Sequence, residues 1–297
     1  MSGQPTHTQQ ASASQRAQDA GSAAERRGRY SESQIQALVD EVLAEGFCIL
    51  EHHFPAEKLR TFGQAFDALL HERIANGTAS GRGPNRYYIS LPFVMPFADP
   101  EIYEDPDILA IIERLGGKDV VMPELASDTP LKDSDYQVIH RDITQLSADR
   151  PDGDPAQPFQ FGINFPLVDV TLENGPFEIA RRTHQIPDAE CQRRIESGEI
   201  EARLEPLLME LGDVMVRDVR ALHRGTPNRT DVPRPMIVVG YNSSWHRRPQ
   251  LRIFIPRDAH ATLSERGRQL LRLNPVVDSL ADASNEEAYS NLYFLEK

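Results

Sequence analysis

The first part of the chain carries apolar residues at helical spacing. Ser31 opens the sequence Ser-Glu-Ser-Gln, a capping-box pattern, and apolar residues then recur three and four positions apart up to Gly46. Similar spacing over residues 55–74 predicts a second helix. Asp105, followed by a proline, predicts the N-cap of a third helix over residues 106–115. We therefore expect the N-terminal third to be mainly helical.

Beyond about residue 120 the pattern changes to short alternating or wholly apolar runs that are separated by turn residues. The runs predicted to be strands are residues 136–139, 159–167, 177–180, 214–216 and 236–241. Two further helices are predicted near residues 187–196 and 262–273. Helices followed by many short strands favour an α+β, mainly β domain whose strands pack as a sandwich or barrel.

Residues 1–29 contain no large apolar residue after Met1 and are predicted to be a disordered tail, because they cannot bury enough surface to offset their ordering entropy. Residues 30–297 are expected to form a single domain. Within it, a Gly-rich loop over residues 76–84 leads into an aromatic-rich segment, residues 86–97.

Composition narrows the classes of partner. The chain has 32 Lys and Arg against 45 Asp and Glu, a net charge of −13, so nucleic acid and anionic lipid are not expected partners. The two cysteines, Cys48 and Cys191, are far apart and are expected to be reduced thiols. No apolar run approaches the length of about 18 residues that spans a bilayer, and no signal peptide is apparent, so we expect no membrane association and a cytoplasmic location.

The candidate chemistry lies in His140 and Asp142, which are two positions apart and would point to the same side of an extended segment. His223 follows a predicted strand, and antiparallel pairing could bring it opposite His140. Two imidazoles and one carboxylate on one face are typical of non-heme Fe(II) oxygenases, with zinc as the competing metal. Arg234 opens the next strand, where its guanidinium could bind a carboxylate through two hydrogen bonds. This combination suggests Fe(II) and 2-oxoglutarate.

These motifs resemble those of the phytanoyl-CoA dioxygenase family of Fe(II)- and 2-oxoglutarate-dependent oxygenases, over roughly residues 31–275. The matching segments are residues 137–142, 165–176, 182–184, 211–213, 223–228 and 234–235. The resemblance implies a double-stranded β-helix (jelly roll) core over about residues 118–256, with flanking N-terminal and C-terminal helices. It implies that His140, Asp142 and His223 bind iron, that Arg234 binds the distal carboxylate of 2-oxoglutarate, and that Gln137 and Asn164 contact this cosubstrate.

The resemblance also implies the reaction: O₂ and 2-oxoglutarate are consumed, succinate and CO₂ are released, and an unactivated C–H bond of a small metabolite or natural-product intermediate is hydroxylated. Asp142 favours hydroxylation over halogenation, because halogenases of this type have a small residue at that position. Desaturation, ring closure and demethylation stay open as outcomes. Two other functions also stay open: a non-catalytic metal-binding jelly-roll protein, and a cupin-like metal hydrolase or isomerase that does not use 2-oxoglutarate.

The substrate is expected to be a small molecule. Arginines crowd the motif region of an otherwise acidic chain, so Arg82, Arg86 or Arg247 are candidates to bind an anionic substrate. Tyr88 and Phe93 follow the Gly-rich loop and are candidates to line the pocket, although core packing is the favoured interpretation for both. The sequence predicts no oligomeric state.

Overall fold

The structure is a computed structural model that describes residues 28–143, 157–246 and 251–280. Its helices are α2 (Glu32–Glu45), α3 (Ala56–Ala75), α4 (Pro100–Tyr103), α5 (Pro106–Gly116), α6 (Asp188–Glu196), α7 (Arg257–Thr262) and α8 (Glu265–Leu271). Its strands are β1 (Phe47–Leu50), β2 (Ser80–Gly81), β3 (Arg86–Ser90), β4 (Val120–Pro130), β5 (Gln160–Pro166), β6 (Phe177–Ala180), β7 (Leu204–Leu207), β8 (Val214–Asp218), β9 (His223–Gly225), β10 (Met236–Ser243), β11 (Ile255–Pro256) and β12 (Val276–Val277).

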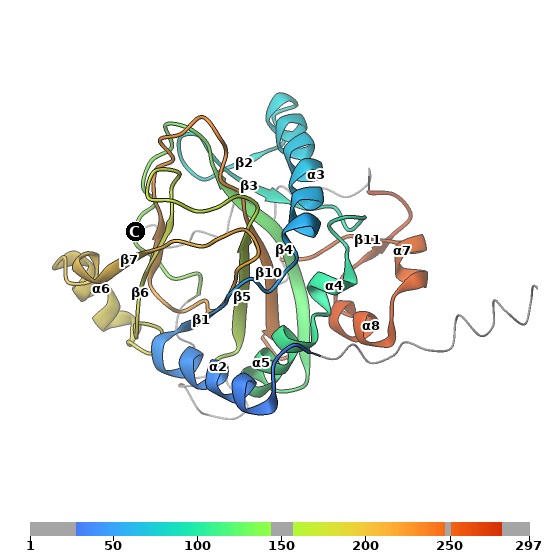
Figure 1. The fold of residues 1–297 in the computed structure, drawn as a ribbon, viewed down its shortest axis with the longest axis horizontal. Helices are drawn as coiled ribbons and strands as arrows, with labels where there is room; N and C mark the ends of the chain where they lie inside the picture. Colours follow the sequence, from blue (N-terminus) through green and yellow to red (C-terminus); the bar gives the residue numbers. More distant parts are fainter. Residues whose placement is uncertain (1–27, 144–156, 247–250, 281–297) are drawn as a thin grey trace, which may run out of the picture.

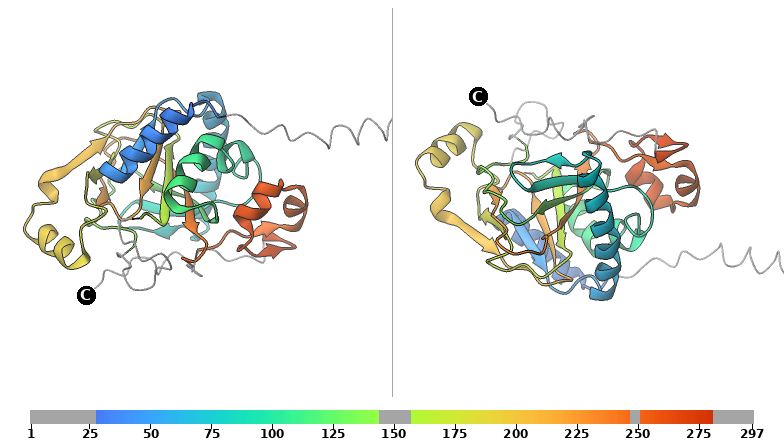
Figure 2. Two further views of the ribbon diagram at one scale, coloured as in Figure 1. Left: turned by 90° about the horizontal axis from the view of Figure 1, so that it is seen from below. Right: turned by 90° about the horizontal axis from the view of Figure 1, so that it is seen from above.

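Two antiparallel sheets form the core of the fold. The major sheet has seven strands in the order β1-β8-β5-β10-β4-β3-β2, and the minor sheet has three in the order β7-β6-β9. In Figure 1, β6 and β7 lie with α6 on one side of β5, and α7 and α8 lie at the opposite end of the molecule; both views in Figure 2 show the same separation. This arrangement confirms the prediction of a mainly β, α+β domain with a double-stranded β-helix core and flanking helices.

The two faces of the major sheet differ in character because successive side chains of a strand point to opposite faces. Phe161, Ile163 and Val216 point to one face and are buried with apolar residues of α2, α3 and α5 in the main core. Asn164 and Arg217 alternate with them and point to the other face, toward the minor sheet. The helices thus cover one face, while the space between the sheets receives polar side chains.

A smaller apolar cluster joins the two sheets. Phe47 of β1 and Met215 of β8 pack with Ile179 of β6, and all three are fully buried or nearly so. The minor sheet is therefore fixed in position over one end of the major sheet, and this contact determines which side chains of the two sheets meet.

Most of the predicted elements are confirmed. Ser31 forms the complete capping box of α2, and the carboxylate of Asp105 accepts hydrogen bonds from the first backbone N–H groups of α5. The helix expected over residues 262–273 is present as α8, which begins later because the side chain of Ser264 caps its start; α7, which ends at Thr262, was not predicted. Cys48 and Cys191 are both free and buried, as expected.

The strand predicted over residues 136–139 is wrong. This segment makes isolated contacts with β9: the N–H of Gln137 donates to the carbonyl of Gly225, and the N–H of His140 donates to that of His223. The side chain of Gln137 accepts the N–H of Gly225, so a side chain replaces the backbone carbonyl of a regular ladder. The apolar alternation could not reveal this replacement.

Across the described ranges, no helix is both long enough and apolar enough to cross a membrane. Residues 1–27 of the predicted tail lie outside the described residues. Arg29, assigned to that tail from the sequence, is instead bound to the domain through its backbone N–H and its guanidinium.

Candidate active site

Backbone hydrogen bonds bring His140, Asp142 and His223 together. The backbones of His140 and His223 exchange two hydrogen bonds, of 3.0 and 2.9 Å, in an isolated antiparallel bridge. The N–H of Asp142 donates to the carbonyl of Val219 at 3.1 Å, which keeps the His-x-Asp segment extended beside β9. The antiparallel pairing expected from the sequence therefore occurs, and it places the two imidazole rings 4.3 Å apart.

The three side chains converge on one point. Oδ1 of Asp142 lies 3.8 Å from Nε2 of His140 and 3.6 Å from Nε2 of His223. A metal about 2.1 Å from each ligand can bridge atoms up to about 4.2 Å apart, so both separations suit a shared ion. Both imidazoles are 3% exposed, whereas Asp142 is half-buried. A buried ligand set with an open side is the geometry that a facial triad requires.

Backbone carbonyls select the ring nitrogen that faces the ion. Nδ1 of His140 lies 2.8 Å from the carbonyl of Val138, and Nδ1 of His223 lies 2.9 Å from that of Ala221. A carbonyl can only accept, so each Nδ1 carries the proton and each Nε2 presents its lone pair to the shared point. Ring orientation and tautomer are thus set by the chain itself.

The electrostatics of the site also favour a bound cation. Burial lowers the pKa of both imidazoles, and for His223 the neighbouring His140 lowers it further, so both are neutral at physiological pH. Burial would raise the pKa of Asp142, but the charge and the hydrogen bond of the Arg217 guanidinium outweigh burial and hold this pKa well below its usual range. Two neutral imidazoles and one carboxylate are in the protonation states that bind a divalent metal.

Arg217 is a site residue whose contacts were not anticipated. Its Nη2 donates to Oδ2 of Asp142 at 2.7 Å, and its Nε donates to Oδ1 of Asn164 at 3.0 Å. Asn164, expected to contact the cosubstrate, therefore binds Arg217, and its amide nitrogen donates to the carbonyl of Ile237 at 3.3 Å. A signal was available: Arg217 is a charged residue in the apolar run of β8, at a position that points away from the helices.

Arg234 lies in the same region and is buried, with 1% of its surface exposed. Its Nε donates to the carbonyl of Gly175 at 2.9 Å, and its Nη1 has no hydrogen-bond partner. Burial lowers its pKa to about 10. The other buried arginines of the described chain are each paired with a carboxylate: Arg86 with Asp128, Arg141 with Asp188, Arg217 with Asp142 and Arg220 with Asp218. Arg234 differs from them in having no ion pair with a carboxylate; Asp128 acts on its charge only through space, and this does not offset the effect of burial on its pKa.

Arg86 is not available to a substrate in this structure. It is 1% exposed, its Nη1 donates to Asp128 at 2.7 Å, and its Nη2 donates to the carbonyl of Thr226 at 2.6 Å. It lies beside Gly225, where an added Cβ would be 2.4 Å from Nη1 of Arg86 and 2.7 Å from Oε1 of Gln137. Gln137 and Arg86 are thus brought together around β9, and Arg86 has a packing and charge-balancing role.

The remaining candidates for the substrate pocket lie in different parts of the structure. Phe93 is 1% exposed and belongs to the main core, where its ring lies 5.6 Å from that of Tyr103, so its expected place in the substrate pocket is not supported. Tyr88 is buried, its hydroxyl donates to Glu124, and the guanidinium of Arg82 lies over its ring. Arg247 lies outside the described residues.

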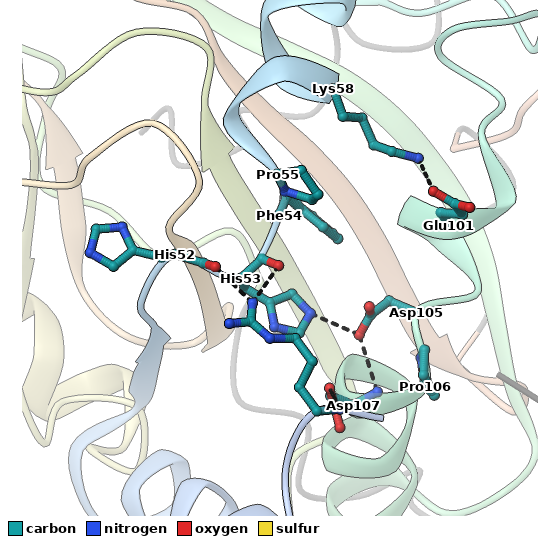
Figure 3. Close-up of a pocket in the computed structure, with 10 residues that line it drawn as sticks. His52, His53, Phe54, Pro55, Lys58, Glu101, Asp105, Pro106 and Asp107 are labelled. Carbon is teal, nitrogen blue, oxygen red and sulfur yellow. Dashed lines mark hydrogen bonds and ion pairs between the residues drawn. The ribbon is translucent and has the colours of Figure 1, made fainter. Parts of the chain in front are cut away.

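A second group of His and Asp side chains lies by a cavity of about 480 Å³ near the start of the domain (Figure 3). Nε2 of His53 is 3.0 Å from Oδ1 of Asp105, which also caps α5, and the oxygens of Asp107 accept the N–H groups of Arg29 and Tyr30. Arg29 donates to the carbonyls of residues 52 and 53. Both carboxylates and Arg29 thus bind backbone groups of the domain, whereas neither ring nitrogen of His53 forms a hydrogen bond; the cluster anchors the N-terminal end of the domain.

Comparison with known proteins gives a family that has this fold and this type of site. The double-stranded β-helix with two histidines and one aspartate defines a class of metal-dependent oxygenase folds. The family model "Phytanoyl-CoA dioxygenase (PhyH)" matches residues 43–236, which is more than half of the chain. The chain belongs to this family, and the prediction of iron, 2-oxoglutarate and O₂ is thereby confirmed at the level of the family.

Solved structures share the fold at low identity. HygX from Streptomyces hygroscopicus, with nickel and 2-oxoglutarate bound, is 19% identical with a TM-score of 0.56, covering 85% of this chain and 99% of its own. The α-ketoglutarate-dependent epimerase SnoN is 17% identical with a TM-score of 0.55, covering 72% and 82%. EvdMO1 is 20% identical with a TM-score of 0.55, covering 71% of this chain, which spans only 50% of EvdMO1.

Proposed function

We propose that this protein is a non-heme Fe(II)- and 2-oxoglutarate-dependent dioxygenase that hydroxylates an unactivated C–H bond of a small molecule. The observation that carries the proposal is the combination of a convergent His140, Asp142 and His223 set with a buried Arg234 that forms no ion pair with a carboxylate of the described chain. A metal triad alone would suit several metalloenzymes. A buried guanidinium without a carboxylate partner in addition favours an anionic ligand beside the metal.

The residues fit the two groups that the family uses. His140, His223 and Asp142 would hold iron on one face through two imidazole nitrogens and one carboxylate oxygen, and Arg234 would bind the distal carboxylate of 2-oxoglutarate through Nη1. When bound, iron and 2-oxoglutarate supply the oxidising chemistry, in which O₂ is consumed and succinate and CO₂ are released.

The protein's own contribution is orientation and charge. The carbonyls of Val138 and Ala221 fix the histidine tautomers, and Arg217 occupies the second oxygen of Asp142. Gln137 is expected to line the cosubstrate site, since its side chain is fixed on the backbone of Gly225 next to Arg86. Asn164 contributes indirectly, because its side-chain oxygen accepts a hydrogen bond from Arg217.

Related folds indicate the class of substrate, and the third metal ligand indicates the outcome. HygX has also been solved with hygromycin B bound, and SnoN is described as an epimerase from nogalamycin biosynthesis, which supports a small-molecule substrate and shows that this fold also serves a reaction named as epimerisation. We propose hydroxylation here because Asp142 fills the third metal position that a halide would otherwise take. An anionic substrate and a cytoplasmic location stay predictions, and Arg86, which is buried and bound to Asp128, is not part of the substrate site that we propose.

The test is an anaerobic titration of metal-free protein with Fe(II) and 2-oxoglutarate, following the weak visible charge-transfer absorption of the chelate. The wild type should develop this band, His140→Ala should not, and His71→Ala, which removes an exposed histidine on α3, should behave as the wild type. Screening small molecules for stimulated succinate release would then identify substrates. Metal binding without a band at any 2-oxoglutarate concentration would favour a hydrolase, an isomerase or a non-catalytic metal protein.

A further inference from the structure

We infer that Arg217 is a positioning residue that aims the carboxylate of Asp142 at the metal. This inference rests on the proposed function, because it assigns a role within the same metal site. Arg217 lies on β8 and is 5% exposed, and its guanidinium reaches Asp142 from 75 residues away in the sequence.

The two oxygens of Asp142 are used differently. Arg217 holds Oδ2 at 2.7 Å, while Oδ1 lies within 3.8 Å of Nε2 of both His140 and His223. A carboxylate with one oxygen engaged by a guanidinium presents the other in a fixed direction. The geometry therefore assigns one oxygen to the metal and the other to Arg217.

Arg217 is itself held on several sides. Asn164 accepts the hydrogen bond from its Nε at 3.0 Å, and the ring of Phe177 lies 5.4 Å from its guanidinium carbon. Phe177 also stacks on His223, with ring centroids 4.8 Å apart at 22°. The same aromatic ring thus supports both the arginine and a metal-binding imidazole.

A glycine leaves the space that this arrangement needs. Gly162 of β5 pairs directly with Arg217 in the sheet, and an added Cβ there would lie 3.1 Å from Nε of Arg217 and 3.2 Å from Oδ1 of Asn164. Any other residue at position 162 would press on the hydrogen bond that orients the guanidinium. The strand register, Gly162 and the side-chain amide of Asn164 together hold the guanidinium of Arg217 in one orientation.

The expected consequence is measurable without turnover. Groups that orient a metal ligand typically change metal affinity by about 10- to 100-fold when they are removed. Arg217→Met keeps a long apolar side chain and removes the donors, so it should weaken Ni(II) binding to the metal-free protein by about 10- to 100-fold. Asn164→Ala should weaken it less, because Arg217 keeps its bond to Asp142.

Isothermal titration with Ni(II), together with a mutant cycle, tests the assignment. Arg224→Gln is the matched control, since Arg224 is the neighbouring arginine bound to Glu178 and Glu201, away from the metal, and it should keep the wild-type affinity. In an Asp142→Ala background, Arg217→Met should cause no further loss, because it acts through Asp142. Arg217→Lys should restore part of the affinity.

Two results would overturn the inference: wild-type Ni(II) affinity in Arg217→Met, or a loss that simply adds to that of Asp142→Ala. If Arg217→Met fails to fold, Gly162→Ala takes its place with Gly81→Ala as control, since a Cβ at Gly81 would meet nothing within 4 Å. Gly162→Ala should weaken Ni(II) binding, and equal affinity of both alanine variants would contradict the inference. Absence of Ni(II) binding in the wild type would instead refute the proposed function.

Discussion

Replacing Arg234 with methionine should stabilise the ligand-free protein and, at the same time, remove most of its affinity for 2-oxoglutarate. The guanidinium is 1% exposed, its Nη1 has no partner, and no carboxylate of the described chain pairs with it. A buried charge in this state opposes folding, and it becomes favourable when an anionic ligand compensates it.

The magnitude follows from the pKa. Burial lowers the pKa of Arg234 from 12.5 to about 10, and at about 1.36 kcal/mol per unit this corresponds to about 3 kcal/mol of destabilisation in the folded protein. The lost hydrogen bond to the carbonyl of Gly175 offsets about 1–2 kcal/mol of this. The net gain for Arg234→Met is therefore about 1–2 kcal/mol, or about 2–6 °C in melting temperature.

Arg234→Met should weaken the binding of 2-oxoglutarate, although it stabilises the ligand-free protein. Removing one partner of a buried, hydrogen-bonded charge pair costs about 2–5 kcal/mol, which is a loss of about 30- to 4000-fold in affinity. Denaturation in the presence of a chelator gives the first quantity, and titration of the Ni(II)-loaded protein with 2-oxoglutarate gives the second. Arg229→Met, which changes an exposed arginine in the same connection, should alter neither. A less stable ligand-free variant that keeps wild-type affinity for 2-oxoglutarate would refute the reasoning.

Two further predictions test the core and the response to acid. Phe93→Ala should lower the free energy of unfolding by about 3–5 kcal/mol and leave 2-oxoglutarate affinity unchanged, because Phe93 is a core residue, whereas Met95→Ala at a position 66% exposed should change stability by about 0.5 kcal/mol or less. A weaker 2-oxoglutarate affinity in Phe93→Ala at normal stability would contradict this. Burial lowers the pKa of His184 in the folded protein. As the pH falls below about 6.5, the pKa of a histidine in the unfolded chain, the unfolded chain binds a proton at this residue that the folded chain does not. The folded protein therefore loses stability as the pH falls through this range. His184→Gln should therefore lose stability less steeply than the wild type between pH 7 and 5 in denaturant titrations, by up to about 1.4 kcal/mol per pH unit, with His71→Gln as the unchanged control; equal slopes would refute this.

Local signals in the sequence were sufficient for much of this protein. The capping box at Ser31 and the N-cap at Asp105 lie within three residues of the groups they satisfy, so they predict α2 and α5 without tertiary information. His140 and Asp142 belong to the same extended segment, whose alternation alone predicts that they point the same way. The order of the motifs was enough to predict the family and the double-stranded β-helix.

The contacts that complete the site depend on tertiary structure. Arg217 and Asp142 are 75 residues apart, and Arg86 reaches the carbonyl of Thr226 across 140 residues. The composition shows that arginines are abundant. The tertiary structure determines which buried arginines form an ion pair with a carboxylate, and it leaves Arg234 without such a partner. The physical reason is that alternation assigns a side chain to a face, whereas strand order and register determine which side chains meet across it.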